Sequence, residues 1–185
     1  MDEEFLEFGI KRENEERRDG GAAVVFDPET KTFAVYKTFD KGHFGLFGGG
    51  VDDGENPRDG ILRAVIEESG LNDFSHIEEM GEFVAHYYHS RKKLNRVTQS
   101  TFFLFILNSK NKIETKHEEH ENFYLDFVNF DELIIDLSSR NQDKDYDHWI
   151  YFLGKADKRL KELGYFWLWF FAIILYNGGI KSLIH

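Results

Sequence analysis

Two adjacent acids, Glu67 and Glu68, are the side chains of this sequence best suited to chemistry. They stand near the end of a predicted short helix that follows a glycine-rich stretch, Gly48–Gly50, and further acidic residues. Carboxylate oxygens are the hard ligands that Mg²⁺ and Mn²⁺ prefer. Glycines let a backbone approach a ligand where side chains would obstruct it. These residue types and this spacing predict an oxygen-rich site for a divalent cation beside a glycine loop.

The helix that carries the two acids has local signals at both ends. Asn56 is a favourable N-cap residue, and Pro57 suits the first helical position. Gly70 supplies the stop that a glycine just past a helix end usually provides. Arg63 lies four residues before Glu67, so the two are neighbours on the helix surface. One helix is therefore expected between the cap and the glycine.

The whole stretch resembles the signature of the Nudix hydrolases, G-x5-E-x7-R-E-U-x-E-E-x-G-U, in which U is a bulky aliphatic residue. The match covers residues 49–71 without an insertion, on Gly49, Glu55, Arg63, Val65, Glu67, Glu68, Gly70 and Leu71. One position departs from the pattern, because Ala64 stands where the family has a glutamate after the arginine.

The resemblance implies an α/β/α sandwich, with a mixed sheet holding the signature loop-helix-loop on one side and the C-terminal helix on the other. It also implies metal-assisted attack of water on the diphosphate of a nucleoside diphosphate derivative, a small-molecule substrate. Glu67 and Glu68 would bind Mg²⁺ or Mn²⁺. Glu55 would bind metal through water or hold Arg63, which would fix a carboxylate by a bidentate pair. The backbone of Gly48–Gly50 would lie near the metal and the phosphates.

A second acidic stretch, His117–Glu121, follows later in the chain. In the family that the signature resembles, a carboxylate from this loop often completes the metal site or acts as general base. Glu119 and Glu121 are favoured over Glu118, because they alternate with His120 and can lie on one side of an extended segment. A transition-metal cluster and a simple solvated acidic loop are the alternatives.

Ala64 leaves two hypotheses open. It lies on the helix face of Glu67 and Glu68, and its methyl group can neither bind metal nor accept a proton. Either the enzyme is active with fewer metal ions or with a base from residues 118–121, or the fold is a non-catalytic nucleotide-binding or regulatory module. The presence of Glu55 and Arg63 with the paired acids favours the first hypothesis.

Composition narrows the possible partners. The 185-residue chain carries a formal net charge of −11, which disfavours DNA because phosphate contacts need Lys and Arg. A nucleotide can still bind where metal ions screen the charge. The chain has no cysteine, which excludes disulfides, and its acidic start lacks a secretory pattern, so a cytoplasmic location is expected.

Residues 1–164 are predicted to form one Nudix domain. Its expected elements are a hairpin of Ala22–Phe26 and Phe33–Tyr36, a strand at Phe44–Phe47, long strands at Phe83–His89 and Ser100–Leu107, a further strand and helix start after the acidic loop, and an amphipathic helix within Asp145–Leu163.

Two basic stretches have competing interpretations. Arg17 and Arg18 belong to a charged segment that is either solvated or reaches the substrate phosphates. Residues 90–96 form either an exposed hairpin tip, which is favoured, or a cationic lid over a phosphate chain that uses Arg91, Lys92, Lys93 and Arg96.

Residues 165–185 form an apolar tail in which twelve consecutive apolar or aromatic residues run from 165 to 176. A helix that spans a membrane needs about twenty such residues. Packing against an exposed face, a homodimer contact and a membrane contact are the three predicted roles.

Overall fold

The computed structural model describes residues 6–90, 92–115 and 122–166. The described strands are β1 (Leu6–Gly9), β2 (Glu16–Arg17), β3 (Gly20–Asp27), β4 (Thr32–Thr38), β5 (Phe44–Gly45), β6 (Phe47–Gly50), β7 (Phe74–His89), β8 (Leu94–Leu107) and β9 (Phe123–Val128). The described helices are α1 (Pro57–Ser69), α2 (Phe130–Ser139) and α3 (Asp147–Glu162).

One mixed sheet joins all of these strands. Its main path runs β1-β7-β8-β3-β4-β5, with β2 beside β8, β6 beside β3 and β9 beside β4. The pairings β1–β7, β2–β8 and β3–β8 are parallel, and the others are antiparallel. Parallel neighbours need long crossover connections, and the segment that contains α1 lies within the connection from β3 to β8.

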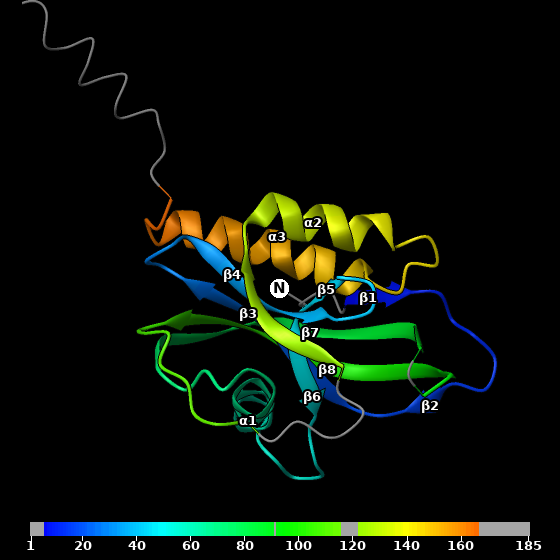
Figure 1. Ribbon diagram of the computed structural model, residues 1–185. Helices are drawn as coiled ribbons and strands as arrows, with labels where there is room; N and C mark the ends of the chain where they lie inside the picture. Colours follow the sequence, from blue (N-terminus) through cyan, green and yellow to red (C-terminus); the bar gives the residue numbers. More distant parts are fainter. Residues whose placement is uncertain (1–5, 91, 116–121, 167–185) are drawn as a thin grey trace, which may run out of the picture.

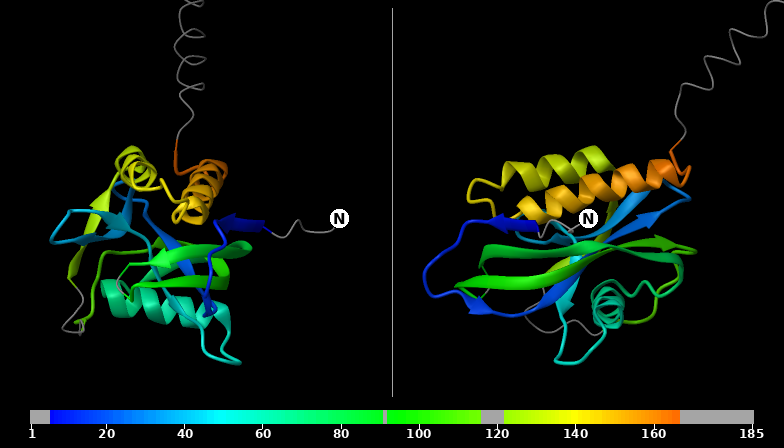
Figure 2. Two further views of the ribbon diagram at one scale, coloured as in Figure 1. Left: turned by 90° about the vertical axis from the view of Figure 1, so that its right-hand side faces the viewer. Right: turned by 180° about the vertical axis from the view of Figure 1, so that it is seen from behind.

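Helices cover both faces of the sheet, so the fold is an α/β/α sandwich. Figures 1 and 2 show α1 on one side and α2 with α3 on the other. Alternation along β3 sends Ala23 and Val25 toward α1, and Val24 and Phe26 toward α3. The sandwich and its mixed sheet are therefore as predicted, with two helices instead of one on the face opposite the signature helix.

Aromatic side chains dominate the core between the sheet and α3. Phe102 on β8 is fully buried and stacks on Phe152 of α3, with ring centroids 4.6 Å apart and planes 5° apart. Phe83 on β7 also contacts Phe152, at 5.1 Å between centroids. These contacts fix α3 over the sheet and thereby place the side chains that precede Phe152 on the same helix.

The hairpin of β3 and β4 and the helix at Asp147–Glu162 confirm the corresponding predictions. The hairpin of β7 and β8 is longer than predicted, since its strands pair from Phe74 to His89 and from Leu94 to Leu107. The tip is therefore shorter than residues 90–96. Arg96 lies inside β8 and is buried, so its placement in an exposed tip is wrong.

The start of the predicted tail contacts the domain. Tyr165 and Phe166 pack on Phe26, with ring centroids 5.6 and 5.5 Å away. The remaining tail, residues 167–185, lies outside the described residues, and its role stays a prediction. Among the helices that the structure describes, none combines the length and the apolar character that crossing a membrane requires.

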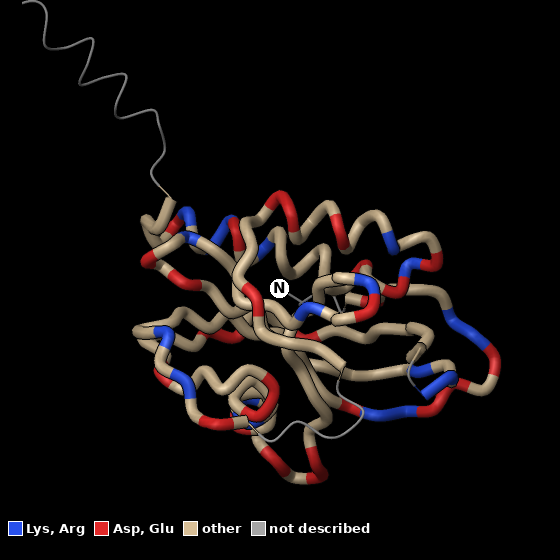
Figure 3. Tube along the Cα trace, in the orientation of Figure 1, with Lys and Arg blue, Asp and Glu red and all other residues tan. Residues whose placement is uncertain are grey.

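Charged side chains are spread over the whole domain. Figure 3 shows acidic positions on the helices and on the loops around the sheet, with basic positions interspersed among them. The net charge of −11 is thus not confined to one face. Any group of basic residues without acidic neighbours therefore stands out against this background.

Candidate active site

Helix α1 begins and ends on the residues that its sequence predicts. The Asn56 side chain accepts a hydrogen bond from the backbone N–H of Arg58 at 2.9 Å, and Pro57 is the first helical residue. Gly70 ends the helix in the left-handed conformation, with φ of 77°. These local signals hold Glu67 and Glu68 in the last turn, next to strand β6.

Arg63 ties the loop before the helix to the helix itself. Its guanidinium donates hydrogen bonds to both carboxylate oxygens of Glu55, at 3.2 and 3.1 Å, and lies 3.6 Å from a Glu67 oxygen. The backbone N–H of Asp52 also donates to Glu55, at 2.9 Å. This backbone hydrogen bond and then Arg63 lower the pKa of the Glu55 carboxyl, against the opposing effect of burial. Glu55 is thus anionic, and its hydrogen bonds link the loop before α1 to Arg63 on the helix.

Glu68 faces a different environment. Its carboxylate accepts a hydrogen bond from the backbone N–H of Gly48 at 3.3 Å. It also lines a cavity of about 460 Å³ on the α3 side of the sheet. Of the three predicted metal ligands, Glu68 lines this cavity, whereas Glu55 and Glu67 lie around Arg63.

The glycines beside Glu68 form a strand, which corrects the prediction of a loop. Gly48, Gly49 and Gly50 pair with Ala22, Gly21 and Gly20 of β3, and the five glycines are called the glycine ribbon below. A Cβ at Gly48 would lie 2.4 Å from the Gly21 carbonyl oxygen, and one at Gly49 would lie 3.0 Å from the Ala64 Cβ. Glycine is needed for this close packing, which brings α1 against β6.

The carboxylates of Glu67 and Glu68 are of the type that binds a hard divalent cation. Within the described ranges, no group of three or more Asp, Glu or His side chains is close enough to hold a metal ion. Glu67 and Glu68 nevertheless supply neighbouring carboxylates at the end of α1, of the type that Mg²⁺ and Mn²⁺ bind. The Glu67 side chain is 63% exposed and can turn toward a ligand. Glu119 and Glu121, the predicted bases, lie outside the described residues.

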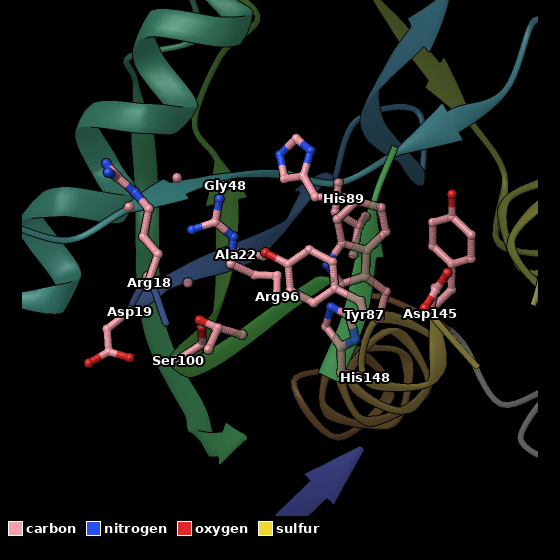
Figure 4. A pocket seen from close by; sticks show the side chains of 18 of the residues that line it. Arg18, Asp19, Ala22, Gly48, Tyr87, His89, Arg96, Ser100, Asp145 and His148 are labelled. Atoms are coloured by element: carbon pink, nitrogen blue, oxygen red, sulfur yellow. The ribbon is translucent and has the colours of Figure 1, made fainter. Parts of the chain in front are cut away.

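The far wall of the cavity consists of residues that the signature does not include. They are Tyr87 from β7, Arg96 from β8, and His148 with Trp149 from α3, together with Arg18 at the rim. Figure 4 shows Arg18, Tyr87, Arg96 and His148 around the cavity. Arg96, Thr98 and Ser100 alternate along β8 and share one buried face. The sequence does not signal this face, because Gln99, which lies between two of them, is polar as well. The aromatic residues of the wall also give no signal, because they resemble ordinary core residues.

His148 is buried in this wall as a neutral ring. It stacks on Phe83 with centroids 5.4 Å and planes 24° apart, and burial lowers the pKa of His148 from 6.5 to about 3. The unfolded chain therefore binds one more proton than the folded chain between these two pH values. Stability contributed by neutral His148 is complete above pH 6.5 and is lost as the pH falls toward 3.

We expect His148→Asn to flatten this pH dependence. Between pH 6.5 and 5.5, the native protein should lose about 1 kcal/mol of unfolding free energy that the variant keeps, since one proton linked over one pH unit amounts to about 1.4 kcal/mol. Urea unfolding at both pH values measures the difference. Equal losses in the two proteins would contradict the prediction.

Comparisons with known proteins bear on the family and the fold of this chain. A family model described as NUDIX domain matches residues 16–150. The MutT protein from Methanosarcina mazei Go1 has a similar structure, with a TM-score of 0.53, 17% identity, and coverage of 81% of this chain and 99% of that one. A NUDIX hydrolase from Nitrosomonas europaea has a TM-score of 0.51 and 16% identity, and covers 76% of this chain and 91% of its own. No curated protein matches the sequence.

Proposed function

Because this chain belongs to the NUDIX domain family, whose members generally cleave nucleoside diphosphate derivatives, we propose that it is a metal-dependent hydrolase that cleaves the diphosphate linkage of such a compound. Water would attack phosphorus. The supporting observation is the position of Glu68, whose side chain extends from the signature helix and lines the cavity beside the Gly48 backbone. A carboxylate of the signature thus meets a space of about 460 Å³, which is in the size range of small-ligand sites.

Each residue of the site has a distinct proposed part. Glu67 and Glu68 would hold Mg²⁺ or Mn²⁺. Such an ion would neutralise charge on the diphosphate oxygens and lower the pKa of a bound water molecule. Arg63 keeps Glu55 and Glu67 on one edge of α1. The Gly48 N–H orients the Glu68 carboxylate. Glu119 or Glu121 is proposed as the general base.

The test is a screen of nucleoside diphosphate derivatives and dinucleotides with Mg²⁺ and with Mn²⁺, scored for released phosphate compounds. We expect release that depends on the metal and stops with a chelator. A protein that binds one of these compounds and cleaves none of them would refute the hydrolase and support the second candidate below.

The second candidate is a module that binds a nucleotide without cleaving it. Ala64 favours it, because this residue is only 6% exposed and packs against β6, where it offers no carboxylate. A Glu at this position would project from the same turn as Glu67 and Glu68. The substitution Ala64→Glu therefore separates the two candidates.

If the native protein is a hydrolase, Ala64→Glu should raise its turnover with Mg²⁺ roughly tenfold. That gain corresponds to about 1.4 kcal/mol of transition-state stabilisation, a modest effect for one added carboxylate. Ala64→Gln, which has the same size without the charge, is the matched control. Equal turnover in the two variants would show that no carboxylate is needed there. Cleavage by Ala64→Glu alone, with none by the native protein, would identify the native chain as the binding module.

A further inference from the structure

The cavity contains a buried arginine whose charge no acidic side chain balances. Arg96 is 5% exposed, and its guanidinium has no hydrogen-bond or ion-pair partner in the part of the chain that the structure describes. Arg18, an exposed residue at the rim of the same cavity, likewise has no side-chain partner among the described residues. Arginine is rarely buried without a partner, so this arrangement calls for a ligand.

The acids that line the cavity are Asp19, Glu68 and Asp145, and hydrogen bonds from other groups reach each of them. Glu68 accepts one from the Gly48 backbone N–H at 3.3 Å. Asp19 accepts hydrogen bonds from Arg17 at 3.0 Å and from the Gln99 backbone N–H at 3.0 Å. Asp145 accepts hydrogen bonds from Arg12 at 2.7 Å and from the Tyr88 backbone N–H at 3.0 Å. Asp19 and Asp145 thus each pair with an arginine other than Arg18 and Arg96.

Strand register brings the two arginines to one face of the sheet. Glu16 pairs with Arg96 in parallel register, and the Arg18 N–H donates to the Val97 carbonyl at 3.1 Å. Arg18 therefore lies beside β8, level with the residue two positions after Arg96. Tyr87 lies directly across from Arg96 on β7. Burial raises the pKa of Tyr87 and the charges of Arg96 and Arg18 oppose this effect, as expected for neighbouring side chains. Figure 4 shows the Arg96 side chain between Arg18 and Tyr87 in this view.

The glycine ribbon forms the wall of the cavity opposite Tyr87. A Cβ at Gly50 would lie 2.6 Å from a guanidinium nitrogen of Arg18, so the arginine lies directly over the bare backbone. Guanidinium groups carry several N–H donors in a planar fork that matches phosphate oxygens. A protein with a net charge of −11 attracts an anion only where such groups are gathered and left unpaired.

We propose that Arg96 and Arg18 form a phosphate subsite that binds a phosphate group of the ligand directly, without a metal ion. Arg96 binds from the far wall and Arg18 from the rim. The subsite rests on the proposed function only for the identity of the natural ligand, a phosphate compound. Binding of a phosphate probe in the absence of metal does not depend on hydrolysis, so the two proposals can fail separately.

The test uses inorganic pyrophosphate in the presence of a chelator, with the dissociation constant measured by calorimetry on the full-length protein. Arg96→Met and Arg18→Met should each weaken binding at least tenfold, which is about 1.4 kcal/mol. Arg17→Met is the matched control, because Arg17 is also exposed and adjacent in sequence but pairs with Asp19 and Gln99. It should change the dissociation constant less than twofold. Arg18→Met keeps the test valid if the buried substitution disturbs folding.

Three results would overturn the subsite. They are no binding of pyrophosphate by the native protein without metal, unchanged affinity in Arg18→Met, and an equal loss in Arg17→Met, which would indicate only a general charge effect. Metal-free binding that depends on Arg18, with no cleavage of any nucleoside diphosphate derivative, would uphold the subsite and refute the hydrolase. Metal-dependent cleavage without metal-free binding would do the reverse.

Discussion

Glu68→Gln is expected to lower kcat/KM with Mg²⁺ by about a hundredfold or more, a loss of about 2.7 kcal/mol in transition-state stabilisation. The substitution keeps the size of the side chain and removes the charge of the signature carboxylate that lines the cavity. Amides are weaker ligands than carboxylates for a hard cation, so Mg²⁺ or Mn²⁺ affinity measured by calorimetry should fall as well.

Two comparison variants make this prediction specific. Glu67→Gln should also weaken metal binding, but less than Glu68→Gln, because the Glu67 carboxylate is 63% exposed and lies 3.6 Å from Arg63. Glu29→Gln removes a charge from the exposed turn between β3 and β4 and should leave both measurements unchanged. Native metal affinity and native turnover in both Glu67→Gln and Glu68→Gln would place the metal ligands elsewhere.

Phe102→Ala is expected to cost about 3–5 kcal/mol of unfolding free energy, as truncation of a buried phenylalanine typically does. Phe102 is fully buried and stacks on Phe152 at 4.6 Å, so its loss opens a cavity between β8 and α3. Chemical denaturation measures the change. Phe39→Ala is the control, because Phe39 is 63% exposed and its truncation should cost less than about 1 kcal/mol. A loss below about 1.5 kcal/mol at Phe102 would show that α3 is held by other contacts.

The part of the site that could be predicted from the sequence is the helix α1, whose ends are set by residues next to them in the chain. Asn56, Pro57 and Gly70 determine the start and the end of α1 through short-range backbone preferences, so the positions of Glu67 and Glu68 on a helix end could be predicted. The contact between Arg63 and Glu55 joins two residues of the same signature, and of the two roles expected for Glu55 the structure contains the ion pair with Arg63, while metal binding stays a prediction.

The glycine ribbon and Arg96 could not be predicted because their environments depend on distant strands. Gly48–Gly50 has the composition of a loop, and it forms a strand because Gly20 and Gly21 on β3 leave room for it. Arg96 belongs to a basic run that suggests a solvated tip. Its burial follows from the register in which Tyr87 pairs with Arg96 and from the contact of Tyr87 with His148 of α3.

The glycine ribbon separates α1 from the cavity by the thickness of a single backbone. A side chain at Gly20 or Gly48 would collide with the carbonyl of the opposite strand at 2.4 Å, and one at Gly49 would push against Ala64. Substitutions that add a side chain in this wall are therefore not tolerated. Tyr87 and Trp149, which line the opposite wall, are only partly buried and have no comparable restriction. A cavity built in this way has one fixed wall and one that can vary, so a new ligand preference can evolve or be engineered from the β7 and α3 side while the carboxylates of α1 keep their places.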